Sequence, residues 1–390
     1  MKKFLFVCGG TGGHIFPAVA IAESLKKMGV ADITFAGRKD SMEERLVAGN
    51  WPYEYITAEP LHRGPFLKNL ALPFKLSKSL VRAKSVVKKV NPDVVVATGG
   101  YVSLPIVLAA GSFGIPVYLQ EQNAVAGVAN KFGSRYAKTI FVTSEDAAKF
   151  FPAGRCMVFG NPVRKLPDGD SLPRPAEFAE GKKAVFIVGG SQGAAGINAK
   201  IEESIKRIAA RDDVSVVWQV GVKNVDAITA RVGDVPNIAI RGFLDGIYAY
   251  MKHADLIISR AGASALAEIL AFGKPSILLP FPHATANHQE HNARVVEKAG
   301  ACLVELDSEP NDLWNKVENL LADSDKLGSM AVAAKGLGMP DAADRIAKEI
   351  LLKEGCDFFA DDSQEGCDFF ADDSQKSELT VRVSISKEDV

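Results

Sequence analysis

The sequence has little cysteine, no long apolar run and almost no net charge, and each absence excludes a class of protein. Its five cysteines are scattered over 390 residues without a C-x-x-C pair or a Cys/His zinc pattern, so we expect reduced thiols in a cytoplasmic protein. No apolar stretch approaches the roughly 20 residues that span a bilayer. The apolar start, residues 4–8, is too short for a signal peptide and reads as a first strand. Ordinary globular composition and this length predict two folded domains.

Acidic residues are missing from one long segment and concentrated in another, although the formal net charge is only −1. Between Pro60 and Pro92 there is no acidic residue, and the basic ones are Arg63, Lys68, Lys75, Lys78, Arg82, Lys84, Lys88 and Lys89. From Glu354 onward the chain is acidic, and residues 354–375 repeat one 11-residue unit twice, which predicts a flexible tail of unassigned purpose. Such segregation concerns partners rather than fold, and we expect no nucleic acid among them.

Two glycine-rich turns carry most of the functional information. Residues 9–14 read Gly-Gly-Thr-Gly-Gly-His and follow the apolar run 4–7. Residues 189–193 read Gly-Gly-Ser-Gln-Gly and follow the apolar run 184–188. A buried strand, a glycine turn and a helix N-terminus together form an anion site, because unpaired backbone N–H groups and the helix dipole point toward the ligand. Two such units predict an α/β chain of two doubly wound domains with a cleft between them.

Neither turn has the residues of the two commonest nucleotide motifs. In a dinucleotide fingerprint starting at Gly10, the third glycine would fall at Ile15, and no acidic residue closes the second strand at 33–38. The second turn continues without the lysine of a P-loop. Hydride transfer and P-loop hydrolysis are therefore disfavoured.

Strand-like and helical runs alternate through both halves, as expected for parallel sheets of βαβ units. The expected strands are 4–7, 33–36, 53–56, 93–97, 115–119, 139–143, 184–188, 214–218, 237–241, 255–258, 276–280 and 301–305. The Pro- and Gly-rich segment 161–181 reads as the linker, which gives domains at 1–160 and 161–339 and a tail at 354–390.

Seven motifs in order resemble the MurG family of bacterial transferases, which move N-acetylglucosamine from UDP-GlcNAc onto lipid I. The resemblance covers roughly residues 1–352, and the tail beyond 354 departs from it. The motifs lie at 9–18, 98–103, 121–123, 160–164, 189–194, 259–268 and 288–293. Any one of them is weakly specific, whereas the ordered set is highly specific.

The resemblance implies a GT-B architecture of two Rossmann-like domains, with a last helix at about 340–353 packing back on the first domain. It also implies an inverting, cofactor-free transfer of GlcNAc to the MurNAc 4-hydroxyl of lipid I, which gives lipid II for peptidoglycan. Two alternatives remain open: a related transferase that glycosylates another membrane lipid, and a non-catalytic nucleotide-sugar sensor.

For the donor, the resemblance and the chemistry of a nucleotide sugar suggest a set of binding residues. Ser191 and nearby backbone N–H groups would bind the diphosphate, and Arg260 would add a charged contact. Glu268 resembles the family's ribose-binding glutamate. The other candidates are Phe243 and Leu244 for uracil, Asn123, Gln289 and Asn292 for the sugar, and Thr11, Gly12, Gly13 and Arg164 nearby. Taken alone, Glu268 is better explained as a solvated helix position, Arg260 as a surface ion pair, Gln289 and Asn292 as helix caps and Phe243 as core, and Arg164 could merely lock the linker. Their joint fit to one ligand favours the donor site.

Catalysis needs a base for the acceptor hydroxyl and a way to stabilise departing UDP. His14 is the first candidate for the base, although it could instead orient the acceptor's diphosphate. Glu121 is either a second candidate or a support for Asn123. Thr11, His14 and Tyr101 are expected on the acceptor side. We expect no metal, because Arg260 and helix dipoles can stabilise the leaving group.

The basic segment suggests a membrane surface as a further partner. A helix from about 74 to 90 would place apolar residues on one face and Lys75, Lys78, Arg82 and Lys89 on the opposite face. Upstream lie the large apolar residues Phe66, Leu67 and Leu70. We therefore expect residues 63–89 to bind anionic lipid peripherally at the cytoplasmic face of the membrane. The alternative is a solvated helix whose apolar face lies in the core. The oligomeric state is left open.

Overall fold

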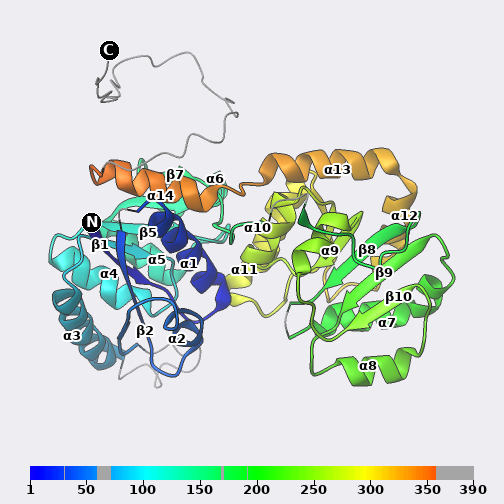
Figure 1. The fold of residues 1–390 in the computed structure, drawn as a ribbon, viewed down its shortest axis with the longest axis horizontal. Helices are drawn as coiled ribbons and strands as arrows, with labels where there is room; N and C mark the ends of the chain where they lie inside the picture. Colours follow the sequence, from blue (N-terminus) through cyan, green and yellow to red (C-terminus); the bar gives the residue numbers. More distant parts are fainter. Residues whose placement is uncertain (30, 59–71, 168–170, 191, 357–390) are drawn as a thin grey trace, which may run out of the picture. The chain divides into compact units, whose positions relative to one another are not determined.

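The computed structural model describes residues 1–29, 31–58, 72–167, 171–190 and 192–356. Within this part of the chain lie two fully parallel sheets, each flanked by helices, as Figure 1 shows. This arrangement confirms the predicted α/β fold with two Rossmann-like sheets.

The first sheet has seven strands in the order β3-β2-β1-β4-β5-β6-β7. The strands are β1 (Lys2–Val7), β2 (Ala31–Gly37), β3 (Tyr53–Tyr55), β4 (Val94–Ala97), β5 (Val117–Glu121), β6 (Ala137–Val142) and β7 (Cys156–Val158). The helices are α1 (Gly12–Lys27), α2 (Met42–Val47), α3 (Leu72–Val90), α4 (Ser103–Ser112), α5 (Val128–Gly133), the 3₁₀ turn η2 (Ser134–Tyr136) and α6 (Glu145–Ala148). The edge strand β7 was not expected, because three residues are too few to show a periodic pattern.

The second sheet has six strands in the order β10-β9-β8-β11-β12-β13. They are β8 (Lys183–Val188), β9 (Val214–Gln219), β10 (Ile238–Arg241), β11 (Leu256–Ser259), β12 (Ser276–Leu278) and β13 (Cys302–Val304). Its helices are α7 (Ala195–Ala209), α8 (Val225–Val232), α9 (Ile247–His253), α10 (Ala263–Ala271), η4 (Thr285–Asn287), α11 (His288–Lys298), α12 (Leu313–Ala322) and α13 (Ser324–Leu337).

Alternation along β1 explains why the first sheet is covered on both faces. Leu5 and Val7 belong to one buried cluster with residues of α3 and α4, whereas Phe4 and Phe6 belong to another with residues of α1. Successive strand side chains point to opposite faces, so a strand buried on both sides needs a continuous apolar run.

The last described helix, α14 (Ala342–Lys353), completes the second of these clusters. Ile346 and Ile350 are fully buried there with Phe4, Phe6 and other residues of the N-terminal half. Beyond the helix, Glu354 accepts a hydrogen bond from Tyr118 at 2.6 Å. The chain therefore returns to its first sheet after building the second.

In each sheet the strand order reverses next to a glycine turn. In the first sheet β2 and β4 flank β1, and in the second β9 and β11 flank β8. Ligands of open α/β sheets bind at such reversal points, beyond the carboxyl ends of the strands. In the part of the chain that the structure describes, no helix has both the length and the apolar character to cross a membrane.

Candidate active site

The first reversal point holds His14, two residues into α1. Thr11 precedes the helix in an extended conformation, and its backbone oxygen accepts from His14 N at 3.0 Å and Ile15 N at 3.2 Å. The loop after β4 approaches so closely that a Cβ atom on Gly100 would overlap the backbone oxygen of Gly9. Gly100 also has a φ of 81°, a conformation that glycine adopts without strain. The two loops therefore pack as one unit around the histidine.

The hydrogen bonds of His14 define which ring nitrogen carries the proton. Its Nδ1 lies 3.1 Å from the backbone oxygen of Thr98 and 2.9 Å from Oε1 of Gln122. Both partners are acceptors, because the Gln122 amide nitrogen donates to the same Thr98 oxygen. In the neutral ring Nδ1 is then the donor, and Nε2 is left with a lone pair. Nε2 makes no hydrogen bond to the described residues, so it can accept a proton from a ligand.

Glu121 is buried, and its carboxylate oxygens accept hydrogen bonds from the loop that follows β5 and from Asn130 on α5. Oε1 accepts from Asn123 N at 3.1 Å, while Oε2 accepts from Gly127 N and Asn130 Nδ2, each at 2.9 Å. Of the two roles expected for Glu121, these contacts favour support of Asn123 and its loop over proton transfer.

Asn292 on α11 is 5% exposed and connects the two halves of the chain. Its Oδ1 accepts from Ala124 N at 2.8 Å, and its Nδ2 donates to Asn123 Oδ1 and Ala261 O, both at 3.2 Å. With partners in both halves, Asn292 forms a bridge between them. Its expected contact with the sugar stays a prediction.

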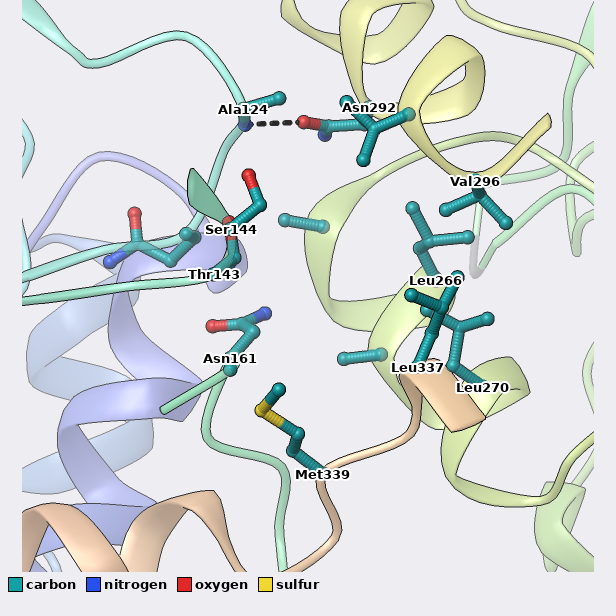
Figure 2. Close-up of a pocket in the computed structure, with 15 residues that line it drawn as sticks. Ala124, Thr143, Ser144, Asn161, Leu266, Leu270, Asn292, Val296, Leu337 and Met339 are labelled. Carbon is teal, nitrogen blue, oxygen red and sulfur yellow. Dashed lines mark hydrogen bonds between the residues drawn. The ribbon is translucent and has the colours of Figure 1, made fainter. Parts of the chain in front are cut away.

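A small pocket lies beside this bridge, as Figure 2 shows. Leu266, Leu270, Val296 and Leu337 line one side, and Thr143, Ser144 and Asn161 lie opposite. Its volume is about 110 Å³, whereas sites for drug-sized ligands usually occupy about 300–1,000 Å³. A nucleotide sugar therefore needs a larger site.

A larger pocket of about 490 Å³ lies at the second reversal point. Its wall includes the glycine turn after β8 and the start of α7, where backbone N–H groups favour an anion. The lining residues are Gly189, Gly193, Ala194, Ala195, Gly196, Arg260, Phe281, Pro282, His283, Gln289 and Asp307. Arg260 and Gln289 are thus brought together as expected, whereas Ser191 lies outside the described residues.

Within this pocket, Asp307 forms a bidentate ion pair with the guanidinium of Arg260. Nη1 and Nη2 of Arg260 each donate to one Asp307 oxygen at 2.8 Å, and Nη1 also donates to Leu279 O at 3.0 Å. The carboxylate lies against the first turn of α7, where a Cβ on Gly196 would overlap it. A carboxylate thus already sits where the helix favours negative charge. The expected contact between Arg260 and a diphosphate stays a prediction and requires a change in this ion pair.

The candidate sugar- and uracil-binding residues differ in exposure. Gln289 is half-buried, and its Oε1 accepts from Phe281 N at 2.9 Å. Its amide nitrogen makes no hydrogen bond to the described residues. Phe243 is 53% exposed and could pack against a base. The Leu244 side chain, by contrast, is buried in a core cluster, so only its backbone is placed to contact a ligand.

Glu268 on α10 forms a polar cluster with residues from two other segments. Tyr248 donates its hydroxyl to Glu268 Oε1 at 2.9 Å. Burial raises the pKa of Glu268, while the Tyr248 hydrogen bond and the positive charge of Arg164 oppose that rise. The Arg164 guanidinium also lies 5.1 Å from the centre of the Phe16 ring on α1. Arg164 is therefore placed between the ribose candidate and the first glycine turn.

The remaining predicted residues lie around the first glycine turn. Thr11 is exposed and makes no side-chain capping bond, and Gly12 and Gly13 begin α1. Tyr101 is half-buried beneath Arg38, whose guanidinium lies 5.2 Å from the ring centre. Among the described residues, no three His, Cys, Asp or Glu side chains gather as a metal site would require.

Four residues that were not predicted from the sequence as site residues contact predicted ones in the structure: Thr98, Gln122, Tyr248 and Asp307. Thr98 follows β4, which pairs with β1, and Gln122 follows β5, the next strand beyond β4. That strand order was the missing signal, because it is not visible in a single sequence. Nothing in the local sequence distinguishes Tyr248 or Asp307 from other helix and loop residues.

Comparison with known proteins agrees with this geometry. Residues 4–142 match the glycosyltransferase family 28 N-terminal domain, and residues 184–346 match the family's C-terminal domain. A relative from Salinibacter ruber is 39% identical over 354 residues, which are 89% of this chain and 95% of the relative. It is named UDP-N-acetylglucosamine–N-acetylmuramyl-(pentapeptide) pyrophosphoryl-undecaprenol N-acetylglucosamine transferase, as is a Desulfitobacterium hafniense relative with 39% identity over 88% of this chain and 97% of its own.

Among solved structures, Acinetobacter baumannii MurG is 30% identical and superposes with a TM-score of 0.75 over 90% of this chain and all of that one. The motifs, both domains and the full-length relatives agree with one another. The chain therefore belongs to glycosyltransferase family 28 and, within it, to the MurG-type transferases that its motifs resemble.

Proposed function

We propose that the protein transfers N-acetylglucosamine from UDP-GlcNAc to the MurNAc 4-hydroxyl of undecaprenyl-pyrophosphoryl-MurNAc-pentapeptide, the step that yields lipid II. Family membership and the names of its full-length relatives support the substrates. The observation that carries the chemistry is the His14 network, which in the neutral ring leaves the Nε2 lone pair free at a strand-order reversal.

In this reaction Nε2 of His14 accepts the proton of the acceptor hydroxyl as its oxygen forms a bond to the anomeric carbon. The bond from that carbon to the diphosphate breaks, and its electron pair leaves with UDP. Attack on the face opposite the leaving group inverts the anomeric centre. Thr98 and Gln122 hold the ring in the tautomer that this transfer needs.

The diphosphate and sugar of the donor are proposed to occupy the larger pocket, and its nucleoside would extend beyond the residues that line it. Its diphosphate would meet the N-terminus of α7, its ribose would meet Glu268, and Gln289 has an amide nitrogen left for a sugar oxygen. Phe243 and the backbone of Leu244 are proposed for the uracil. Arg260 would contribute its charge once Asp307 yields at least one of its two hydrogen bonds.

The test is turnover of UDP-GlcNAc with two acceptors, lipid I and diacylglycerol, followed by UDP release and product mass. The proposal expects a single hexosamine added to lipid I and no product from diacylglycerol. A product from diacylglycerol alone would establish the related lipid transferase instead. Tight UDP-GlcNAc binding without turnover on either acceptor would favour the nucleotide-sugar sensor.

We also propose that the protein reaches its lipid-linked acceptor by peripheral binding at the cytoplasmic membrane face. In α3, Ala83, Val86 and Val87 are buried in the core, so this face of the helix is not available to lipid. The proposal therefore depends on the basic residues and on Phe66, Leu67 and Leu70, which lie outside the described residues. Three basic residues already have protein contacts. Arg82 donates to Tyr55 O at 2.9 Å, Lys89 pairs with Glu54 at 2.7 Å, and Lys88 Nζ lies 5.6 Å from the centre of the Phe113 ring.

Vesicle sedimentation tests this proposal by comparing anionic and neutral lipid. The variant Lys75→Glu/Lys78→Glu should lose anionic binding, because each basic contact contributes about 1 kcal/mol near an anionic surface. Lys206→Glu/Lys223→Glu, which changes charge equally on exposed sites of the second domain, is the control. Equal binding of wild type to both lipids, or equal losses in both variants, would contradict it.

A further inference from the structure

Tyr248 makes two contacts with α10, the helix that carries Glu268. Its hydroxyl donates to Glu268 Oε1 at 2.9 Å, and its ring lies 5.7 Å from the ring of Phe272, which caps the C-terminus of α10. Tyr248 itself lies on α9, directly after the loop that carries Phe243 and Leu244. It therefore connects the segment proposed to bind the uracil with the residue proposed to bind the ribose.

Burial and the neighbouring charges shift the pKa of both partners. Burial and then the Glu268 carboxylate raise the pKa of Tyr248 to about 12, so the phenol remains a donor. The Tyr248 hydrogen bond and the Arg164 charge both lower the pKa of Glu268 against the effect of burial. Burial outweighs both, so the pKa of Glu268 is raised, and the Tyr248 hydrogen bond limits that rise while it orients the carboxylate.

We propose that Tyr248 is a positioning residue for the donor's ribose, which it serves by fixing the Glu268 carboxylate. A carboxylate offers about four acceptor positions, so one bond from Tyr248 leaves enough for the 2′- and 3′-hydroxyls. With its orientation set in advance, the carboxylate loses less freedom when the ribose binds. This inference rests on the proposed function, since it assumes a ribose at Glu268.

The chain offers a matched control on the same helix. Tyr250 donates its hydroxyl to Glu177 Oε2 at 3.3 Å, and its ring stacks on Phe186 at 5.6 Å. Tyr250→Phe thus removes the hydrogen bond between a tyrosine of α9 and Glu177, a glutamate with no proposed role in donor binding. In Tyr248→Phe the ring contact with Phe272 is retained, so only the hydroxyl is tested.

The experiment measures steady-state kinetics of both variants with UDP-GlcNAc and with its 2′-deoxyuridine analogue. In Tyr248→Phe we expect the KM for UDP-GlcNAc to rise about tenfold, as for loss of one hydrogen bond to a charged group, with kcat within about twofold. The preference for the ribose donor over the deoxy donor should shrink. Tyr250→Phe should match wild type in all three quantities.

Two further readouts separate positioning from packing. The groups that act on the Glu268 carboxylate are Tyr248 and Arg164, so loss of the hydroxyl should raise its pKa. The acidic increase in donor KM should then begin at a higher pH in Tyr248→Phe than in wild type. In a Glu268→Ala background, Tyr248→Phe should have no additional effect on KM.

Equal effects of the two tyrosine variants, or a Tyr248→Phe effect that persists without Glu268, would overturn the inference. If wild type uses UDP-GlcNAc normally and Tyr248→Phe does too, the inference alone fails. If wild type neither binds nor uses UDP-GlcNAc, the proposed function fails and the inference fails with it.

Discussion

The two glycine turns are built alike but differ in the state of their functional side chains. Each follows a central strand, opens a helix and stands where strand order reverses. At the first, His14 is bonded through Nδ1 and leaves Nε2 open to a ligand. Beside the second, Arg260 follows the neighbouring strand β11, and both of its terminal nitrogens are bonded to Asp307.

This difference shows that the same backbone motif can accompany either a side chain that is open to a ligand or one that is already bonded within the protein. The first site needs no rearrangement before it takes a proton, because its hydrogen bonds already select the tautomer. The second holds an internal anion against the helix that would receive a diphosphate, so a ligand must compete with a protein carboxylate. Substitutions around the two turns should therefore have effects of different size and, at Asp307, of different sign.

The largest effect is expected at the first turn. His14→Ala should lower kcat by roughly 10²–10⁴-fold, the usual contribution of a general base. Added imidazole should restore part of the rate. His253→Ala is the control, since His253 also bonds a backbone oxygen, that of Leu172 at 2.9 Å. A near-normal kcat in His14→Ala would leave this residue no more than an orienting role.

A smaller effect is expected for Glu268→Ala. Loss of a charged acceptor for the ribose hydroxyls should weaken donor binding by about 1.5–3 kcal/mol, measured as donor KM or by calorimetry with UDP-GlcNAc. Glu177→Ala removes a glutamate that also accepts from a tyrosine of α9 and is the matched control. Unchanged donor affinity in Glu268→Ala would remove Glu268 from the ribose site.

Asp307→Asn should act in the opposite direction. Without the carboxylate charge, Arg260 and the start of α7 become available to the diphosphate, and UDP should bind up to roughly fivefold more tightly, or about 0.3–1 kcal/mol. Asp213→Asn is the control, because it breaks a similar bidentate pair, with Arg211 at 2.6 Å for both bonds, outside the pocket. It should leave UDP affinity unchanged. Weaker UDP binding in Asp307→Asn would show that Asp307 organises the site rather than competing for it.

Metal removal is expected to have the smallest effect. EDTA should leave turnover within about twofold, because backbone N–H groups at α7 and the Arg260 charge are proposed to stabilise departing UDP. The measurement is the initial rate before and after chelation, with Mg²⁺ or Mn²⁺ added back. A complete loss that only the metal restores would place that role on a cation.

The fold was predictable from sequence because each strand buried on both faces is a continuous apolar run, and each glycine turn marks where such a run ends. The site was predictable only in part. His14 and Glu268 were found through motifs, whereas Thr98 and Gln122 become partners of His14 only through the order of strands β1, β4 and β5. The Arg260–Asp307 pair joins residues 47 positions apart, and no local sequence pattern predicts such a contact.

The return of α14 to the first sheet affects how the protein can be made. Ile346 and Ile350 lie in the same buried cluster as Phe4 and Phe6, so the first domain lacks part of its core until nearly 350 residues have been synthesised. Domains usually fold one after another as the chain emerges from the ribosome. Here the domain that begins synthesis first cannot finish folding first, and a fragment cut after the first sheet would expose apolar surface that α14 normally covers.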